Sequence, residues 1–165
     1  PRTRTTLVVA GGIGVAPLFF LAESLIQRGM PLHFLLGART QAQLLCRLQL
    51  RNLGVHLMTS TDDGSEGFPG LVTQLLEKFL LQESFGPHST FVCSAGPEPM
   101  LSQVSSLARK FGILGQISME QQMACGVGAC LGCVVACRFR GKGRRYRRVC
   151  TDGPVFGLEE IAFQQ

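Results

Sequence analysis

Over its first two thirds, the amino-acid sequence alternates short apolar runs with longer segments that carry apolar residues at helical spacing. A short apolar run between turn residues is typical of a strand covered on both faces, and recurrence every third or fourth residue is typical of a helix. The predicted strands are 6–10, 32–36, 55–59, 90–93 and 116–119, and the predicted helices are 15–27, 41–53, 71–81 and 99–111. This alternation predicts an α/β fold with a doubly wound parallel sheet.

The pattern changes after Met119, where glycine and cysteine become frequent and two β-like segments follow, at 133–139 and 146–150. We therefore expect two parts: an α/β domain over residues 1–115 and a small C-terminal subdomain over residues 116–165.

The C-terminal part carries a cysteine pattern, C-x4-C-x2-C followed by a distant fourth cysteine. This spacing is typical of plant-type 2Fe–2S sites, in which a short loop holds one side of the cluster and a remote thiolate closes the other. The predicted ligands are Cys125, Cys130, Cys133 and Cys150. Three glycines are expected to allow positive φ angles and a close approach of backbone N–H groups to the sulfurs. They are Gly126, Gly128 and Gly132.

Two alternatives to this ligand set stay open. A tetrahedral zinc site is the first, although zinc sites favour two C-x2-C pairs and only Cys130 and Cys133 form one. The second is Cys137 as fourth ligand, although it lies only four residues beyond Cys133, in a predicted strand. Cys46 lies in a predicted apolar helix, and we interpret it as a buried core residue.

A glycine-rich turn, GGIGVAP at 11–17, joins the first predicted strand to the first helix. Gly12 and Gly14 fit a turn that lets a pyrophosphate approach a helix N-terminus, but Pro17 replaces the third glycine of the usual motif. The turn alone also fits a purely structural role.

Three polar or small-residue segments, 37–39, 61–65 and 93–97, follow predicted strands and should meet at one edge of the sheet. Together with the turn they predict a nucleotide site that includes Gly96. Asp62 and Asp63 would repel a 2′-phosphate, which favours NAD over NADP. We assign no role to the three histidines, His33, His56 and His88.

The net charge of +5 arises from one run, since seven of the sixteen basic residues lie between Arg138 and Arg148. With no Trp and a single Tyr, stacking platforms for single-stranded nucleic acid are scarce, so we expect no nucleic-acid partner. The run fits a solvated hairpin or a docking patch for an acidic partner.

Seven cysteines, five of them in the last 41 residues, do not resemble a secreted disulfide framework. Clustered thiols indicate a metal site in a reducing compartment, so we expect a cytoplasmic protein. The apolar stretch at 7–21 is interrupted by glycines and a proline, which argues against a signal peptide or a membrane span.

Four motifs, GGIGVAPL, LGAR, TDDGS-x-G-x-x-G and C-x-x-GPEPML, resemble the pyridine-nucleotide domain of ferredoxin–NADP reductase-type enzymes. The tail, MACGVGACLGCVV followed by Y-x-RVCTDGPVF, is similar to the electron-transfer subunit of NAD-dependent (type 1B) dihydroorotate dehydrogenase. That resemblance implies that electrons pass from a separate FMN-containing catalytic subunit, within a heterotetramer, to a 2Fe–2S cluster, then to FAD, and finally as hydride to NAD⁺.

Carried over by motif, the resemblance implies that Gly12 and Gly14 lie by the NAD pyrophosphate and that Cys93 faces the nicotinamide. Asp62 and Ser65 would line the adenosine side. Members of this family also have an N-terminal β-barrel with an R-x-[YF]-[ST] flavin motif, which nothing in these 165 residues matches. The chain is then a truncated piece, or its flavin site is shared or lost.

Three functions remain in view from the sequence. The first is the subunit described above, or its relatives in NADH-dependent ferredoxin–NADP oxidoreductases and sulfide dehydrogenases. The second is an electron relay without flavin, and the third is a zinc-stabilised nucleic-acid-binding domain that uses the basic run.

Overall fold

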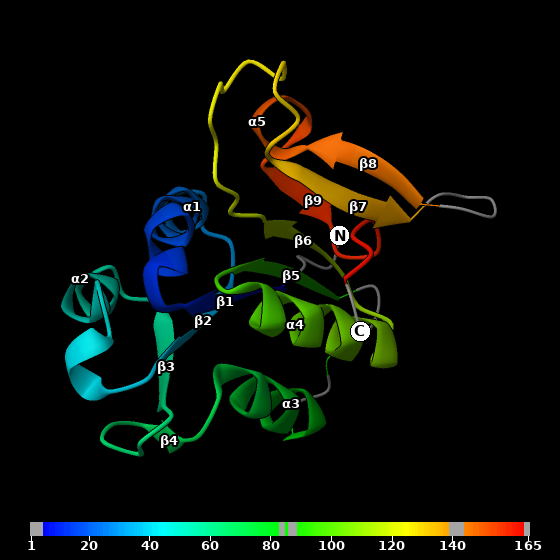
Figure 1. Ribbon diagram of the computed structural model, residues 1–165. Coiled ribbons are helices and arrows are strands. Elements are labelled where there is room, and N and C mark those ends of the chain that lie inside the picture. The colour runs from blue at the N-terminus through cyan, green and yellow to red at the C-terminus, as the bar shows by residue number, and fades with distance from the viewer. Residues whose placement is uncertain (1–4, 83–84, 86–88, 139–143, 164–165) are drawn as a thin grey trace.

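The computed structural model of the protein describes residues 5–82, 85, 89–138 and 144–163 and centres on a seven-stranded sheet (Figure 1). The strands of this sheet are β1 (Thr5–Gly11), β2 (Leu32–Ala38), β3 (His56–Thr61), β4 (Phe68–Pro69), β5 (Thr90–Ala95), β6 (Leu114–Ser118) and β9 (Val155–Gly157). Their order is β4-β3-β2-β1-β5-β6-β9, and every neighbouring pair is parallel except β6 and β9. The predicted α/β class is confirmed.

Helices cover both faces of the sheet, as expected for strands that are apolar throughout. They are α1 (Val15–Gln27), α2 (Arg47–Asn52), α3 (Val72–Gln82), α4 (Glu98–Lys110) and α5 (Val149–Asp152), with short 3-10 turns η1 (Gly12–Gly14) and η2 (Gln41–Gln43). Apolar residues of α1 and α2 pack with one face of β1 and β2, and those of α3 and α4 pack with the other face. Residues 6–11 of β1 are all buried between these two layers.

The strand order reverses direction between β1 and β5. The chain runs from β1 outward through β2 and β3, then crosses back to place β5 and β6 on the other side of β1. In an open α/β sheet, ligands bind beyond the carboxyl ends of the strands at such a switch point. The topology thus places the turn after β1 at the position where a ligand crevice is expected.

The predicted helix at 41–53 is wrong in its first half. The structure has η2, then a turn, then the six-residue α2, and Cys46 between them adopts φ 56°. A left-handed residue cannot continue the hydrogen bonding of a right-handed helix. Cys46 is therefore half-buried at the start of a helix, and the prediction that it is a buried residue within a helix is wrong. The neighbouring Leu44 is buried in the core.

The C-terminal part consists of an irregular loop at 119–133, a hairpin of β7 (Val134–Arg138) and β8 (Arg144–Arg148), α5, and β9. Figure 1 shows the loop and hairpin standing beyond the β6 side of the sheet. Strand β9 returns to pair with β6, and the buried side chains of this part join the core under α3 and α4. The predicted division between residues 115 and 116 falls inside β6 and stays a prediction. No described helix is long and apolar enough to cross a membrane.

Candidate functional site

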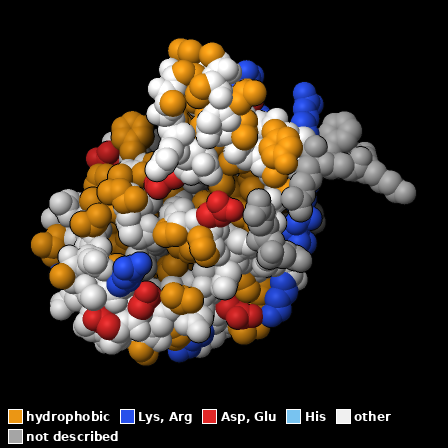
Figure 2. Space-filling view, viewed as in Figure 1, with side chains coloured by type: hydrophobic (Ala, Val, Ile, Leu, Met, Phe, Trp, Pro, Cys, Tyr) orange, Lys and Arg blue, Asp and Glu red, His pale blue; other side chains and the backbone are white. Residues whose placement is uncertain are grey.

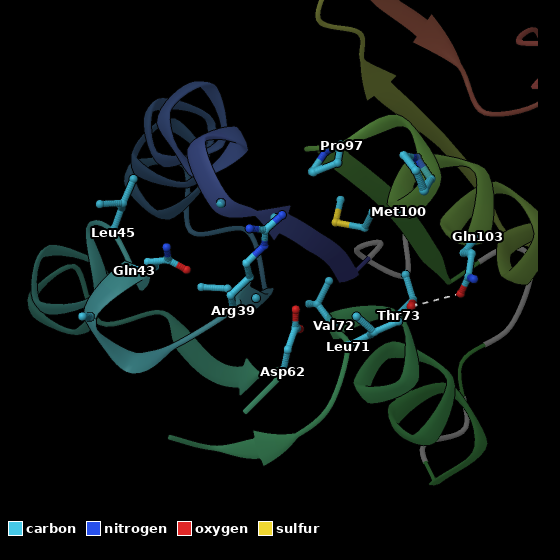
Figure 3. Close-up of a pocket in the computed structure, with 16 residues that line it drawn as sticks. Arg39, Gln43, Leu45, Asp62, Leu71, Val72, Thr73, Pro97, Met100 and Gln103 are labelled. Atoms are coloured by element: carbon cyan, nitrogen blue, oxygen red, sulfur yellow. Dashed lines mark hydrogen bonds between the residues drawn. The ribbon is translucent and has the colours of Figure 1, made fainter. Parts of the chain in front are cut away.

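A cleft of about 560 Å³ lies at the carboxyl ends of β1, β2 and β3, beside the start of α4 (Figure 3). The cleft is lined by Gly11, Gly12, Gly37, Ala38, Arg39, Ala42, Gln43, Leu45, Asp62, Leu71, Val72, Thr73, Pro97, Pro99, Met100 and Gln103. Its position at the switch point and its mixture of apolar walls with a few polar groups suit a nucleotide or another small ligand.

The glycine-rich turn forms one edge of the cleft. Gly12 adopts φ 54° and lines the cleft, whereas Gly14 is buried beneath it. A Cβ atom on Gly14 would lie 2.3 Å from the carbonyl oxygen of Ala95 and 2.6 Å from the nitrogen of Gly96. Gly14 therefore allows the start of α1 to sit against the end of β5, and neither Gly14 nor Gly96 is in the cleft lining.

The loop after β3 presents Asp62 to the cleft and holds its other polar residues away from it. The Asp63 carboxylate accepts hydrogen bonds from Ser65, at 3.0 Å from its N–H and 2.6 Å from its hydroxyl, and these bonds lower the pKa of Asp63. The Ser65 hydroxyl in turn accepts the N–H of Gln41 at 2.8 Å. The predicted Ser65 is outside the cleft lining and joins the loop to η2.

Glu66 anchors the same loop and carried no sequence signal. Its carboxylate forms ion pairs with Arg47 and Arg51 of α2, and its backbone exchanges two hydrogen bonds of 2.9 Å with the Thr61 hydroxyl. Of the acidic and hydroxyl residues predicted for the adenosine side, Asp62 alone lines the cleft.

Cys93 is not brought to the cleft. It lies two residues before the end of β5 and packs against the core layer of α1. Burial raises the pKa of its thiol to about 11, so the group stays protonated at neutral pH. A role in facing a nicotinamide stays a prediction that the cleft lining does not support.

Several cleft residues were not singled out from the sequence. Arg39 follows β2 and had been named only as part of a loop, yet its side chain lines the cleft, as that of Asp62 does (Figure 3). On the opposite wall, Met100 and Gln103 face inward from α4, and Gln103 accepts the Thr73 hydroxyl at 3.1 Å. Met100 and Gln103 are one helical turn apart on α4. This spacing can be seen in the sequence, but it is equally typical of residues that face the core.

The second site is the cysteine loop, whose four predicted ligands form two pairs. The backbone N–H of Cys130 lies 3.4 Å from the Cys125 sulfur, and the Cys133 and Cys150 thiols lie close enough to shift each other's pKa. No described group of three or more His, Cys, Asp or Glu side chains is close enough to hold a single ion. A 2Fe–2S cluster takes two thiolates on each of its two irons, so an arrangement in two pairs fits it, whereas a tetrahedral zinc needs all four around one ion.

Backbone N–H groups favour thiolate at this site, and metal binding requires thiolate. Hydrogen bonds led by the N–H of Cys130 lower the pKa of Cys125 to about 6. In the other pair, the N–H and the thiol of Cys150 lower the pKa of Cys133, and the pKa of Cys150 rises because its thiol donates to that sulfur. Cys125 and Cys133 thus favour the thiolate form that a cluster needs.

The backbone of the loop differs in one respect from the prediction. Gly126 and Gly128 have φ of 68° and 82°, but Gly132 does not adopt a positive φ, and the neighbouring Leu131 does, at 58°. A bulky residue in this region is strained and is found mainly where surrounding structure imposes it. The N–H that follows, on Gly132, points at the Cys130 sulfur at 3.4 Å.

Cys137, the alternative fourth ligand, is buried in β7, where its thiol faces the carbonyl of Val135 at 3.9 Å. Burial raises the pKa of Cys137, and no hydrogen bond joins its sulfur to another described cysteine. Cys150 lies next to Cys133 because Val149 donates its N–H to the Cys133 carbonyl at 3.0 Å and starts the short α5. The sequence had placed Cys150 at the end of a strand.

Two protein families match separate stretches of the chain. Residues 8–106 match the oxidoreductase NAD-binding domain. The chain belongs to this family. Residues 120–162 match the iron–sulfur cluster binding domain of dihydroorotate dehydrogenase B.

Curated relatives extend the match over nearly the whole chain. The chain is 40% identical over 97% of its length to a protein of Caldanaerobacter subterraneus subsp. tengcongensis named dihydroorotate dehydrogenase B (NAD(+)), electron transfer subunit. A protein of Shouchella clausii with the same name is 38% identical over 97% of the chain. The resemblance inferred from the motifs is confirmed. The chain spans only 60% and 58% of the length of these two relatives.

Solved structures agree on the architecture. The NADH-dependent reduced ferredoxin–NADP oxidoreductase superposes on 98% of this chain with a TM-score of 0.81 and 29% identity. The ferredoxin reductase of carbazole 1,9a-dioxygenase covers 67% of the chain with a TM-score of 0.58 at 20% identity, a similarity of fold.

Proposed function

We propose that this chain is the electron-transfer part of an NAD-linked oxidoreductase of the dihydroorotate dehydrogenase B type, active in pyrimidine biosynthesis. The observation that carries the proposal is the paired arrangement of Cys125 with Cys130 and Cys133 with Cys150, on the same chain as a cleft of the NAD-binding family. When bound, the cluster would supply one-electron transfer, and FAD would convert single electrons to hydride chemistry. We assign no FAD contact to residues of this chain.

Within this proposal, the residues of the chain have two tasks. The four thiolates hold the cluster, and N–H groups such as that of Gly132 stabilise charge on the sulfurs. At the cleft, the turn at Gly12 would approach the pyrophosphate with its backbone, while Asp62 would accept hydrogen bonds from a ribose. Arg39 offers a cation to the phosphates from the same wall.

A partner subunit is part of the proposal, and the loop surface supports it. Three apolar side chains next to the ligand cysteines are exposed: Met123, Val127 and Leu131, by 51%, 74% and 59%. Figure 2 shows apolar side chains gathered at the top of the molecule, where Figure 1 places this loop. Exposed apolar side chains that gather in one place are typical of protein contacts. We propose that this loop surface binds the FMN-containing catalytic subunit and that the protein works in the cytoplasm.

The first experiment is a UV–visible spectrum of the chain purified without oxygen, with iron, sulfide and zinc assayed on the same sample. Two irons and two sulfides per chain are expected, and flavin bands would show that this chain also holds FAD. Cys130→Ser should lose the cluster while the circular dichroism of the sheet is kept, and Cys137→Ala is the matched control that keeps it. A colourless chain containing zinc, or a Cys137 variant that loses iron while Cys150→Ser does not, would contradict the assignment.

A second experiment tests the nucleotide site by titration with NADH and NADPH. The Asp62 carboxylate should repel a 2′-phosphate, so NADH should bind more tightly, and Asp62→Asn should reduce that preference by about tenfold. Glu77→Gln removes the same charge from α3, outside the cleft lining, and should leave the preference unchanged. Tighter binding of NADPH by the unaltered chain would overturn the choice of NAD.

The similarity to the NADH-dependent ferredoxin–NADP oxidoreductase supports a second candidate, an electron-transfer subunit of that class. The two candidate functions can be distinguished by mixing the chain with each candidate partner and measuring reduction of the cluster. Reduction of the cluster by dihydroorotate and a catalytic subunit, but not by reduced ferredoxin, would favour the first.

A further inference from the structure

Arg148, the last residue of β8, encloses the turn that carries Cys150. Its backbone N–H donates to Oδ2 of Asp152 at 2.8 Å, and its guanidinium donates to both carboxylate oxygens, each at 3.3 Å. These two residues stand at the two ends of the segment 148–152, so their ion pair closes the short turn of α5 around the cysteine. In the sequence, Arg148 stands out only as one cation of the basic run at 138–148.

The same guanidinium reaches the cysteine loop. Its Nη1 atom donates to the carbonyl oxygen of Gly128 at 3.3 Å, and the N–H of Gly128 lies near enough to the Cys150 sulfur to offset part of the rise in the pKa of Cys150. Gly128 is the one buried residue of the described segment 120–132. A Cβ atom on it would lie 3.1 Å from Thr151 Cγ2 and 3.2 Å from Arg148 Nη1, so the loop backbone rests directly on these two side chains.

Arg148 therefore connects the two halves of the proposed ligand set. One half is the loop that holds Cys125 and Cys130, and the other is the turn that holds Cys150. A planar guanidinium can serve both because it presents several N–H donors in a fixed fork, which a lysine does not.

We propose that Arg148 is a positioning residue for the iron–sulfur cluster and also raises its reduction potential, an inference that rests on the proposed function. By fixing the carbonyl of Gly128, Arg148 holds the N–H of Gly128 toward the Cys150 sulfur. Its permanent positive charge favours the reduced cluster, which carries one more negative charge than the oxidised one. Asp152 orients the guanidinium and partly offsets its charge.

The test compares Arg148→Gln, Arg148→Lys and the matched control Arg145→Gln in the whole chain carrying its cluster. Arg145 lies on the same strand, is exposed, and forms no ion pair with a described residue. The two readouts are the midpoint potential, from a redox titration followed by absorbance, and the rate at which a chelator removes iron.

For Arg148→Gln we expect the one-electron reduction equilibrium to fall about tenfold, a shift of about 59 mV to more negative potential. Iron release should be at least about threefold faster, since the loop loses its link to the turn. Arg148→Lys should keep most of the potential, because the charge remains, and still release iron faster. Arg145→Gln should match the unaltered chain in both.

A second pair of variants separates charge from structure. If the charge acts on the cluster, Asp152→Asn should raise the potential, and the double variant with Arg148→Gln should lie near the unaltered value. Unchanged potential and iron release in Arg148→Gln, or equal shifts in Arg145→Gln, would overturn the inference while leaving the cluster itself established. An unaltered chain that forms no two-iron cluster would overturn the proposed function and this inference together.

Discussion

The sheet of this protein and its cysteine loop are specified by different kinds of interaction. In the sheet, β1 contributes six buried residues in succession, and helices cover both faces. In the loop, residues 120–132 form no helix or strand, and nearly all of them are exposed. Burial of apolar surface stabilises the first region, whereas positive φ angles, thiol pairs and the Arg148 contact define the second.

The difference indicates how each region depends on a cofactor. A sheet with its own core folds without a ligand, while a loop with little buried surface gains its stability from what its thiolates bind. Between the two lies the β7–β8 hairpin, whose buried face joins the core of the sheet.

Phe34→Ala should show how strongly the sheet depends on its core. Phe34 is fully buried in β2, so its truncation should lower the free energy of unfolding by roughly 3–5 kcal/mol. Val127→Ala, in the loop and 74% exposed, should change it by less than about 0.5 kcal/mol. Urea denaturation followed by circular dichroism measures both. Similar losses in the two variants would mean that the loop has a packed core of its own.

Arg147→Ala tests the attachment of the C-terminal part to the sheet. Its guanidinium lies 4.9 Å from the ring centroid of Phe156, forms an ion pair of 2.8 Å with Glu160, and donates to the Asp152 carbonyl at 2.9 Å. Losing these contacts should cost roughly 1–2 kcal/mol in thermal or urea unfolding. Arg145→Ala, on the same strand, is the control and should have little effect; an equal loss there would point to a general effect of charge.

Thiol reactivity compares the two regions in one sample. In the cluster-free chain near about pH 7.5, Cys125 should be almost fully thiolate, whereas Cys93, with its pKa raised to about 11, should stay protonated. Because a thiolate of low pKa is intrinsically less nucleophilic, the net advantage of Cys125 should be at least about tenfold in alkylation rate. Mass spectrometry after timed iodoacetamide treatment gives both rates. Raising the pH should accelerate Cys93 and leave Cys125 almost unchanged, and faster labelling of Cys93 at neutral pH would contradict its buried position.

Leu131→Gly tests whether the loop carries backbone strain. Leucine at φ 58° is unfavourable and glycine is not, so the substitution should stabilise the chain by about 0.5–1 kcal/mol. Leu48→Gly, at a similarly exposed leucine within α2, should instead destabilise it by about 1 kcal/mol. Thermal unfolding with the cluster in place shows whether each variant is more or less stable than the unaltered chain. If both variants change stability in the same direction, Leu131 carries no backbone strain.

Much of this protein could be predicted from local patterns. Apolar runs such as 6–10 and 90–93 became strands because a continuous apolar run is stable only when covered on both faces. The spacing of Cys125, Cys130 and Cys133 identified the metal-binding loop because ligand separation along a short loop limits the geometry it can form. The predicted helix at 41–53 was wrong because the left-handed backbone at Cys46 interrupts it, so its leucines do not lie on one helix face.

Tertiary structure alone decided which candidates meet. Asp62 reaches the cleft while Ser65 and Glu66 are held by η2 and α2, and these partners lie far away in sequence. Cys93 lies on β5, one of the strands that lead to the predicted site, but its side chain packs against the core. In the sequence, Arg148 is one of seven cations in a basic run. Only the fold brings its guanidinium to the carbonyl of Gly128. Local sequence fixes torsions and burial preference, whereas the neighbours of a polar side chain depend on how distant segments pack.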